Sequence, residues 1–274
     1  MAPAVVGASP AEGLPALAAL EARLGARLGV AVQDTGSGRR WAHRGDERFP
    51  MCSVFKAMAG AAVLAMVDDG REDLQRRILF EAGTLVPWSP VTETRVGGHG
   101  MTLAELCEAA ITRSDNTAGN LLLQELGGPA GLTAFMRRLG DATSRLDRWE
   151  TALNEATPGD PRDTTTPAAM AANFQALLAG PALGPRSRER LAAWLVASRT
   201  GDAKLRAGLP ADWRVGDKTG AGAHGTMNDV AIAWPPGRAP IVVSAFITQT
   251  GASLEQRNAA LAEVGRVAAG VLAA

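Results

Sequence analysis

The sequence predicts a mixed α/β fold of the α+β type. One antiparallel sheet is built from both chain ends and flanked by terminal helices, and an all-helical domain is inserted between them. Strand-like segments occur before residue 49 and after residue 210, whereas the residues between follow a helical pattern. Chain ends that pair in one sheet enclose the block between them and leave a cleft at the seam. We expect two domains: residues 1–48 together with residues 201–274 form the sheet domain, and residues 49–200 form the helical domain.

The N-terminal segment predicts a helix followed by a hairpin. Leu17, Leu20, Leu24 and Leu28 recur at helical spacing. The stretch "GVAVQDTGSGRRWAHRG" then predicts two strands around a tight glycine-rich turn at residues 35–38.

From Ser53 to about residue 200 the pattern is helical, and no strand is expected there. "TLAEL", beginning at Thr102, is a capping box before an apolar run, and "GGPAGLTAFMRRLG" begins and ends another helix with glycine. Beyond residue 210, "WRVGDKTG", "NDVAIAW" and "APIVVSAFITQT" predict three strands. A last helix is expected from Leu254, capped by Ser253 with Gln256.

Composition excludes several classes of partner. Lys plus Arg and Asp plus Glu number 28 each, so no charge excess marks a nucleic-acid or anionic-membrane surface. Charged residues interrupt every apolar stretch, which predicts no membrane-spanning helix. "APAVVGASPAEG" after Met1 lacks the basic and apolar regions of an export signal, so any such signal has been removed or never existed.

Cysteine and histidine usage indicates neither a disulfide framework nor a metal centre. Cys52 and Cys107 are the only cysteines, and we expect two buried thiols. His43, His99 and His224 have no ligand spacing, so neither a metal nor a cofactor is expected.

Three short motifs could carry chemistry. Ser53 and Lys56 form S-x-x-K, which puts both side chains on one face of a helix start, although an ordinary helix beginning would look the same. "SDN" at 114–116 lies between two helices and could equally be an N-cap turn. "KTG" at 218–220 could bring a strand edge against a ligand or merely end a strand. The G-x-G-x-x-G at 220–225 precedes a strand, so a dinucleotide site is not expected.

Together, S-x-x-K, S-D-N and K-T-G in this order resemble the penicillin-recognising serine enzymes. "RLDRWETALNEATPGDPRD" resembles the omega loop of class A β-lactamases, with Glu150, Leu153 and Asn154 matching its E-x-x-L-N pattern and Arg148 and Asp163 its latching ion pair. The resemblance covers nearly the whole chain, including "ELGGPAGLTAFMR" and "GRAPIVVSAFIT", and is closest to the branch of chromosomal penicillinases and serine carbapenemases. It implies a β-lactamase/transpeptidase-like fold.

The resemblance assigns a role to each catalytic group. Ser53 would be the nucleophile, activated either by Lys56 or by Glu150 through a water, and the backbone N–H groups of Ser53 and Ala221 would form the oxyanion hole. Glu150 would also activate the water that hydrolyses the acyl-enzyme.

Ser114 would pass a proton to the lactam nitrogen, with Lys218 keeping the local field positive. The implied substrate-binding residues are Trp88, Asn116, Asn154, Thr219, Gly220 and Lys204.

The sequence departs from the family pattern at residues that bind the substrate carboxylate and at residues that determine which β-lactams are hydrolysed. Met227 stands where many members carry an arginine, and Lys204 either replaces that cation or is a solvated surface lysine. In carbapenemase relatives a disulfide joins the residue before the nucleophile to the residue two after K-T-G. Here Cys52 is present, but Gly222 stands at the position of the second cysteine. Ala221 also lacks the hydroxyl that those relatives tend to have there. We therefore expect hydrolysis of penicillins and early cephalosporins, with carbapenems turned over slowly at best.

Two rival functions remain open at this stage: a DD-peptidase, which would not be expected to carry Glu150-x-x-Leu153-Asn154, and a non-hydrolysing β-lactam sensor. The expected partner is a small β-lactam, with no nucleic acid and no membrane. The resemblance further implies antibiotic resistance, a monomer, and a periplasmic or secreted location.

Overall fold

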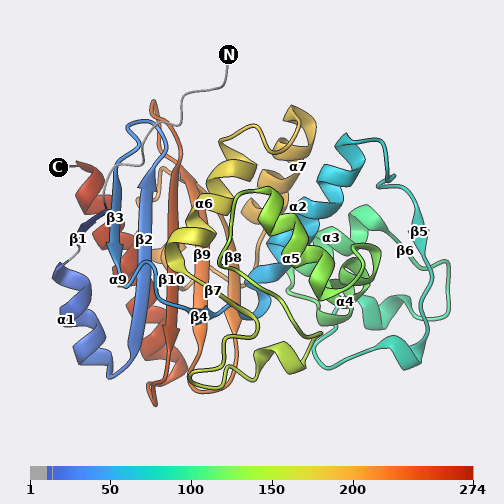
Figure 1. The fold of residues 1–274 in the computed structure, drawn as a ribbon, viewed down its shortest axis with the longest axis horizontal. Helices are drawn as coiled ribbons and strands as arrows, with labels where there is room; N and C mark the ends of the chain where they lie inside the picture. The colour runs from blue at the N-terminus through green and yellow to red at the C-terminus, as the bar shows by residue number, and fades with distance from the viewer. Residues whose placement is uncertain (1–10, 14, 274) are drawn as a thin grey trace.

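A six-stranded sheet dominates one half of the molecule (Figure 1). In this computed structural model, residues 11–13 and 15–273 are described. Neighbouring strands are antiparallel except β1 and β3, which pair in parallel. The strands, in their order across the sheet, are β1 (Ala11–Gly13), β3 (Arg40–His43), β2 (Arg27–Asp34), β10 (Ile241–Thr248), β9 (Met227–Trp234) and β8 (Arg214–Ala221). The predicted fold class is confirmed.

The two ends of the chain meet where β2 pairs with β10. The register runs from Arg27 opposite Thr248 to Asp34 opposite Ile241, so both strands are paired along their whole length. β8 lies at the edge of the sheet, and this edge faces the helical part of the molecule (Figure 1).

One face of the sheet is covered by α1 (Pro15–Leu24), α8 (Leu205–Gly208) and α9 (Leu254–Ala273). Side chains at alternate positions of the strands point to this face and pack against the three helices. The shared core includes Leu17, Val30, Leu205, Val243 and Leu261.

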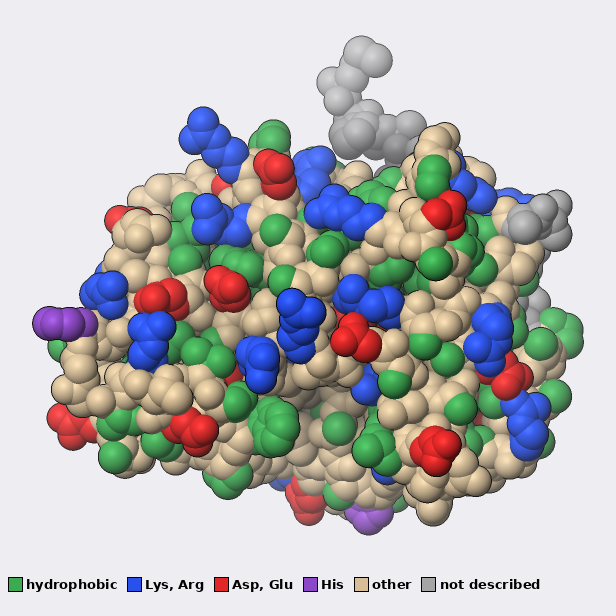
Figure 2. Space-filling model, turned by 180° about the vertical axis from the view of Figure 1, so that it is seen from behind, with side chains coloured by type: hydrophobic (Ala, Val, Ile, Leu, Met, Phe, Trp, Pro, Cys, Tyr) green, Lys and Arg blue, Asp and Glu red, His purple; other side chains and the backbone are tan. Residues whose placement is uncertain are grey.

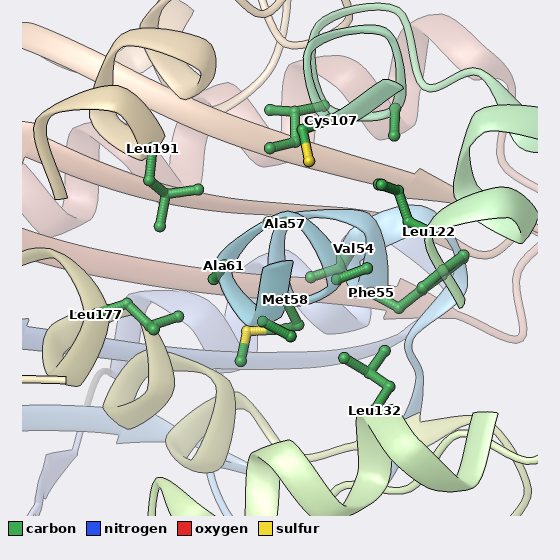
Figure 3. Close-up of a cluster of buried hydrophobic side chains, with 14 of the residues drawn as sticks. Val54, Phe55, Ala57, Met58, Ala61, Cys107, Leu122, Leu132, Leu177 and Leu191 are labelled. Carbon is green, nitrogen blue, oxygen red and sulfur yellow. The ribbon is translucent and has the colours of Figure 1, made fainter. Parts of the chain in front are cut away.

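The other face packs against a second core built around α2 (Phe55–Asp68), whose residues from Phe55 to Leu64 are all buried. A helix that is apolar on every side requires neighbours on every side. Figure 3 shows side chains from the surrounding helices pointing at α2. These helices are α3 (Leu103–Thr112), α4 (Asn116–Glu125), α5 (Pro129–Arg138), α6 (Pro167–Leu178) and α7 (Pro185–Val196).

The structure confirms two predicted helix caps. Thr102 and Glu105 form a reciprocal capping box at the start of α3. The Gln256 N–H donates to Ser253 Oγ over 3.2 Å, and the Ser253 N–H donates to Gln256 Oε1 over 2.8 Å, at the start of α9.

Three expectations are wrong in detail. Leu28 does not continue the first helix, because Gly25 adopts φ +55° and ends it, so Leu28 falls in β2. The helical stretch contains short strands, in which two residues pair: β5 (Arg77–Ile78) with β6 (Met101–Thr102), and β7 (Thr164–Thr165) with β4 (Phe49–Pro50). β1 was not expected either. Four 3₁₀ turns complete the described elements: η1 (Cys52–Val54), η2 (Ala82–Thr84), η3 (Thr92–Arg95) and η4 (Ala152–Asn154).

Acidic and basic side chains are interspersed over the face drawn in Figure 2, with neither sign gathered in one large field. Among the described residues, no helix combines the length and apolarity needed to cross a membrane.

Candidate active site

A cleft of about 490 Å³ lies at the β8 edge of the sheet, bounded by the starts of α2 and α4 and by the omega loop, residues 145–163. Nine of the twelve predicted site residues line it: Ser53, Trp88, Ser114, Asn116, Asn154, Lys204, Thr219, Gly220 and Ala221. Thr200, Met227 and Leu254 line it as well. The remaining three predicted residues, Lys56, Glu150 and Lys218, are buried directly behind this wall.

Ser53 lies in η1, immediately before α2, and its hydroxyl connects two of the buried groups. Ser53 Oγ accepts a hydrogen bond from Lys56 Nζ over 3.0 Å and donates to Glu150 Oε1 over 3.3 Å. Its side chain is mostly buried but lines the cleft. The hydroxyl is therefore within proton-transfer reach of both groups that could activate it.

Lys56 is fully buried and pairs with an equally buried carboxylate, with 2.9 Å between Nζ and Glu150 Oε1. It also donates to the Ser114 carbonyl over 2.9 Å and to Asn116 Oδ1 over 2.5 Å. Burial lowers the pKa of Lys56, and the Glu150 charge opposes that shift. Gly119 provides the space for this side chain, since a Cβ there would lie 2.8 Å from Lys56 Cε.

Ser114 and Lys218 form a second polar pair. Lys218 Nζ donates to Ser114 Oγ over 3.0 Å and to the Thr219 carbonyl over 2.8 Å. Burial, helped by the nearby Lys56 cation, lowers the pKa of Lys218 to about 7. Ser114 adopts φ +56°, a backbone conformation that is costly for a residue with a side chain and that is frequent at functional sites.

The S-D-N segment does cap a helix, but only one of its residues does so. Asp115 is the N-cap of α4, where its carboxylate accepts from the Ala118 N–H, and it also accepts from Thr92 Oγ1. Asn116 Nδ2 donates to the Pro87 carbonyl over 2.7 Å, while Asn116 Oδ1 accepts a hydrogen bond from Lys56 Nζ. The segment thus serves both purposes that the sequence left open, a cap and a cleft wall.

The omega loop presents Glu150 and Asn154 to Ser53. Asn154 Nδ2 donates to Glu150 Oε2 over 2.5 Å, while the buried Asn154 Oδ1 has no hydrogen-bond partner. Asn120 holds the loop through its amide, accepting from the Glu150 N–H and donating to the Glu150 carbonyl over 2.9 and 3.1 Å. The pair of Arg148 and Asp163 is present as expected, with Nε to Oδ2 at 2.6 Å.

Glycines allow the backbone of β8 to approach the nucleophile. A Cβ on Gly220 would lie 2.9 Å from the Met51 carbonyl, and one on Gly222 would lie 2.8 Å from Cys52 Sγ. Asn228 on β9 donates to the same backbone, 3.2 Å from the Met51 carbonyl. The end of β8, including Ala221, is thereby held beside η1.

The far end of the cleft carries the cation that the sequence singled out. Thr219 Oγ1 lies 2.7 Å from Thr200 Oγ1, and half-buried Lys204 donates to the Thr200 carbonyl over 2.7 Å. Met227 is 3% exposed and forms part of the same wall. Lys204 therefore lines the cleft.

Two exposed apolar side chains also line the cleft: Trp88, 67% exposed, and Leu254, 59% exposed. Exposed large apolar groups on a cleft wall supply contact area for a ligand. Sequence reasoning assigned no site role to Leu254, Thr200, Asn120 or Gly119. The position of Asn120 four residues after Asn116, on one helix face, was the signal available for it.

Comparison with known proteins agrees with this geometry. Residues 15–272 match the Beta-lactamase enzyme family. The chain is 60% identical over 253 residues to Beta-lactamase AST-1 of Nocardia asteroides, covering 92% of this chain and 81% of that protein. It is 49% identical over 252 residues to Carbapenem-hydrolyzing beta-lactamase KPC of Klebsiella oxytoca, covering 92% and 86%.

Solved structures are equally similar. An ancestral class A β-lactamase (GNCA) superposes with a TM-score of 0.93 at 65% identity, covering 94% of this chain and 99% of that one. The class A β-lactamase PenP of Rhodopseudomonas palustris, described as putative, gives 0.93 at 56% identity, covering 94% and 98%. The chain therefore belongs to the β-lactamase enzyme family. Within that family it is a class A serine β-lactamase.

Proposed function

We propose that this protein hydrolyses the β-lactam ring of penicillins and cephalosporins through an acyl-enzyme on Ser53, and so confers resistance to these antibiotics. The observation that carries the proposal is the position of Ser53 Oγ in the cleft, 3.0 Å from Lys56 Nζ and 3.3 Å from Glu150 Oε1. A hydroxyl becomes a useful nucleophile when an adjacent group removes its proton as it attacks.

In acylation, Ser53 Oγ attacks the lactam carbonyl carbon. The hydroxyl proton of Ser53 is transferred to the buried pair of Lys56 and Glu150. The hydroxyl already donates to Glu150, which makes Glu150 the direct acceptor in this arrangement, and a neutral Lys56 would be the other. The N–H groups of Ser53 and Ala221 stabilise the oxyanion, and one such donor contributes about 3 kcal/mol.

Collapse of the tetrahedral intermediate breaks the carbon–nitrogen bond, and the nitrogen takes a proton from Ser114. The proton that Glu150 took from Ser53 then passes to Ser114, so that Ser114 is again a hydroxyl and Glu150 enters deacylation as a carboxylate. Lys218, 3.0 Å from Ser114 Oγ, favours this transfer because its charge lowers the cost of the developing alkoxide.

Deacylation needs a water between Glu150 and the ester carbonyl. Asn154 Oδ1 is a buried acceptor without a partner beside Glu150, which suits an acceptor for that water. Glu150 removes a proton from the water, the oxygen attacks the ester carbon, and Ser53 Oγ leaves with a proton.

Substrate recognition follows from the rest of the cleft wall. Thr219 and Lys204 bind the substrate carboxylate, and the buried charge of Lys218 attracts it. Asn116 Nδ2 has one N–H left for the amide side chain of the substrate. Trp88 and Gly220 bound the space for the fused rings.

The proposed spectrum is penicillins and early cephalosporins, with slow turnover of carbapenems. The second cysteine of carbapenemase relatives stands at position 222, beside Cys52. Here that position is a glycine with little room for a side chain, because a Cβ on Gly222 would lie 2.7 Å from the Asn154 carbonyl oxygen. Comparable catalytic efficiencies for imipenem and benzylpenicillin would contradict this spectrum.

Turnover of nitrocefin and benzylpenicillin tests the function, with Ser53→Ala as the inactive control. Continuous hydrolysis by the wild type, abolished in Ser53→Ala, is expected. A stoichiometric burst that then stops would instead identify a sensor or a DD-peptidase.

We also propose that the cleft separates a unit of residues 1–48 and 201–274 from a unit of residues 49–200. The enzyme is proposed to act in the periplasm or as a secreted protein, and as a monomer. Four large apolar side chains are exposed among the described residues, and two of these four line the cleft, which leaves little exposed apolar surface for a subunit interface. Light scattering after gel filtration tests the monomer.

A further inference from the structure

Asp229 is a buried carboxyl group that the proposed mechanism does not use. It lies on β9 with no exposed surface, directly opposite Thr219 of β8, so both side chains point to the same face of the sheet. That face is the one covered by α8. Asp229 is therefore placed beneath the end of the cleft that holds Lys204.

One oxygen of Asp229 binds the backbone directly after this lysine. Asp229 Oδ2 accepts the Leu205 N–H over 3.1 Å at the first residue of α8. The residue in the N-cap position is Lys204 itself, whose side chain makes no capping hydrogen bond. Asp229, on the neighbouring strand β9, thus caps α8 in place of the side chain of its N-cap residue.

The surroundings of Asp229 favour its neutral form. Burial and the nearby Asp217 carboxylate raise the pKa of Asp229, against the opposing effects of Lys204 and Arg206. Asp217 is itself matched by Arg206, with Nη2 to Oδ1 at 3.3 Å. A raised pKa weakens the competition of Asp229 for the charge of Lys204, and the carboxyl group can accept the Leu205 N–H in either protonation state.

We propose that Asp229 is a positioning residue for substrate binding: by fixing the backbone at Leu205, it holds Lys204 where the ammonium meets the substrate carboxylate. This inference rests on the proposed function and extends it to a residue outside the cleft. Because the contact is with the binding end of the cleft and not with Ser53, its loss affects KM and leaves kcat nearly intact.

The test compares Asp229→Ala, Asp229→Asn and Lys204→Ala with the wild type. Asp229→Ala is expected to raise KM for benzylpenicillin roughly fivefold to tenfold, the effect of one lost buried hydrogen bond, with kcat changed less than about twofold. Asp229→Asn keeps an acceptor oxygen in a neutral group of the same shape and should rescue KM. If Asp229→Ala does not fold, Asp229→Ser, whose hydroxyl is too short to reach the amide, carries the same expectation.

Two further measurements separate positioning from a general loss of structure. In the Lys204→Ala background, the Asp229→Ala change should have almost no additional effect on KM, because the group it positions is gone. The preference for benzylpenicillin over its methyl ester should fall in Asp229→Ala. It should not fall in Ser244→Ala, which removes a buried hydroxyl from the other side of the sheet.

The outcomes are distinct for each claim. An unchanged KM in Asp229→Ala, an equal loss in Asp229→Asn, additive effects with Lys204→Ala, or a silent Lys204→Ala would each overturn the positioning role. Failure of the wild type to open the lactam ring would instead overturn the proposed function.

Discussion

Lys56 Nζ and Glu150 Oε1 lie 2.9 Å apart, and neither side chain has exposed surface. A buried ion pair of this kind is stable only when the remaining donors and acceptors are also paired. Here Ser53, Asn116 and Asn154 supply those partners. The same contacts place the nucleophile between an acid and a base, so the pair organises the whole site.

The charge of Lys218 predicts a pH dependence. Its pKa is lowered to about 7, mainly by burial, so the ammonium is lost as the pH rises through that value. We expect kcat/KM for benzylpenicillin to fall severalfold, roughly fivefold or more, between about pH 6 and about pH 9. Lys218→Arg should flatten this profile, because a guanidinium stays charged. An equally steep fall in the variant would assign the pH dependence to another group.

The space at Gly119 predicts a steric effect on Lys56. Gly119→Ala should lower kcat/KM by at least about tenfold, because the new Cβ would lie 2.8 Å from Lys56 Cε. Gly270→Ala is the matched control, since Gly270 lies in α9 with nothing within 4 Å of its Cβ position. The control should keep full activity and gain about 0.5–1 kcal/mol in unfolding free energy. Equal activity in both variants would show that Lys56 has room to shift.

The omega-loop ion pair between Arg148 and Asp163 predicts a loss of stability when it is broken. Arg148→Ala leaves the carboxylate of Asp163, which is 1% exposed, without its cation, and should cost about 3 kcal/mol in urea unfolding. Arg145→Ala breaks a more exposed pair with Asp147 in the same loop and should cost less than about 1 kcal/mol. Similar losses for the two variants would argue against a specific role for Asp163.

The cysteines predict a thiol count that depends on unfolding. Cys52 and Cys107 are both free and buried, which confirms the expectation from sequence, and burial raises the pKa of each thiol. The native protein should react with no equivalent of a thiol reagent, and the denatured, unreduced protein with two. Finding no thiol after denaturation would reveal a disulfide and contradict the structure.

The elements that sequence predicted well are those with a long pattern. The five longer sheet strands and the helices with caps have several residues of periodicity or a paired signal such as Thr102 and Glu105. The two-residue strands have no alternation to detect, and β1 pairs with β3 only because tertiary structure brings them together. Leu28 continued an apolar spacing by chance, and only the backbone at Gly25 shows that the helix had ended.

At the site, motifs placed the residues that carry chemistry but not those that support them. Ser53, Ser114 and Lys218 stand in recognisable patterns. The support from Asn120 and Asp229 depends on which strand or loop packs against each residue. A single side chain such as Asp229, far from Lys204 in sequence, has no spacing that would reveal its contact with Leu205.

The acyl-enzyme on Ser53 is tested most directly by intact-protein mass spectrometry of the Glu150→Gln variant mixed with benzylpenicillin. Glutamine keeps the shape of Glu150 but cannot serve as the base for the hydrolytic water, whereas Ser53 and the oxyanion hole are unchanged. We predict a single penicilloyl adduct that persists and maps to the peptide containing Ser53, and no such adduct in Ser53→Ala. Steady turnover by Glu150→Gln, or an adduct on another residue, would contradict the account.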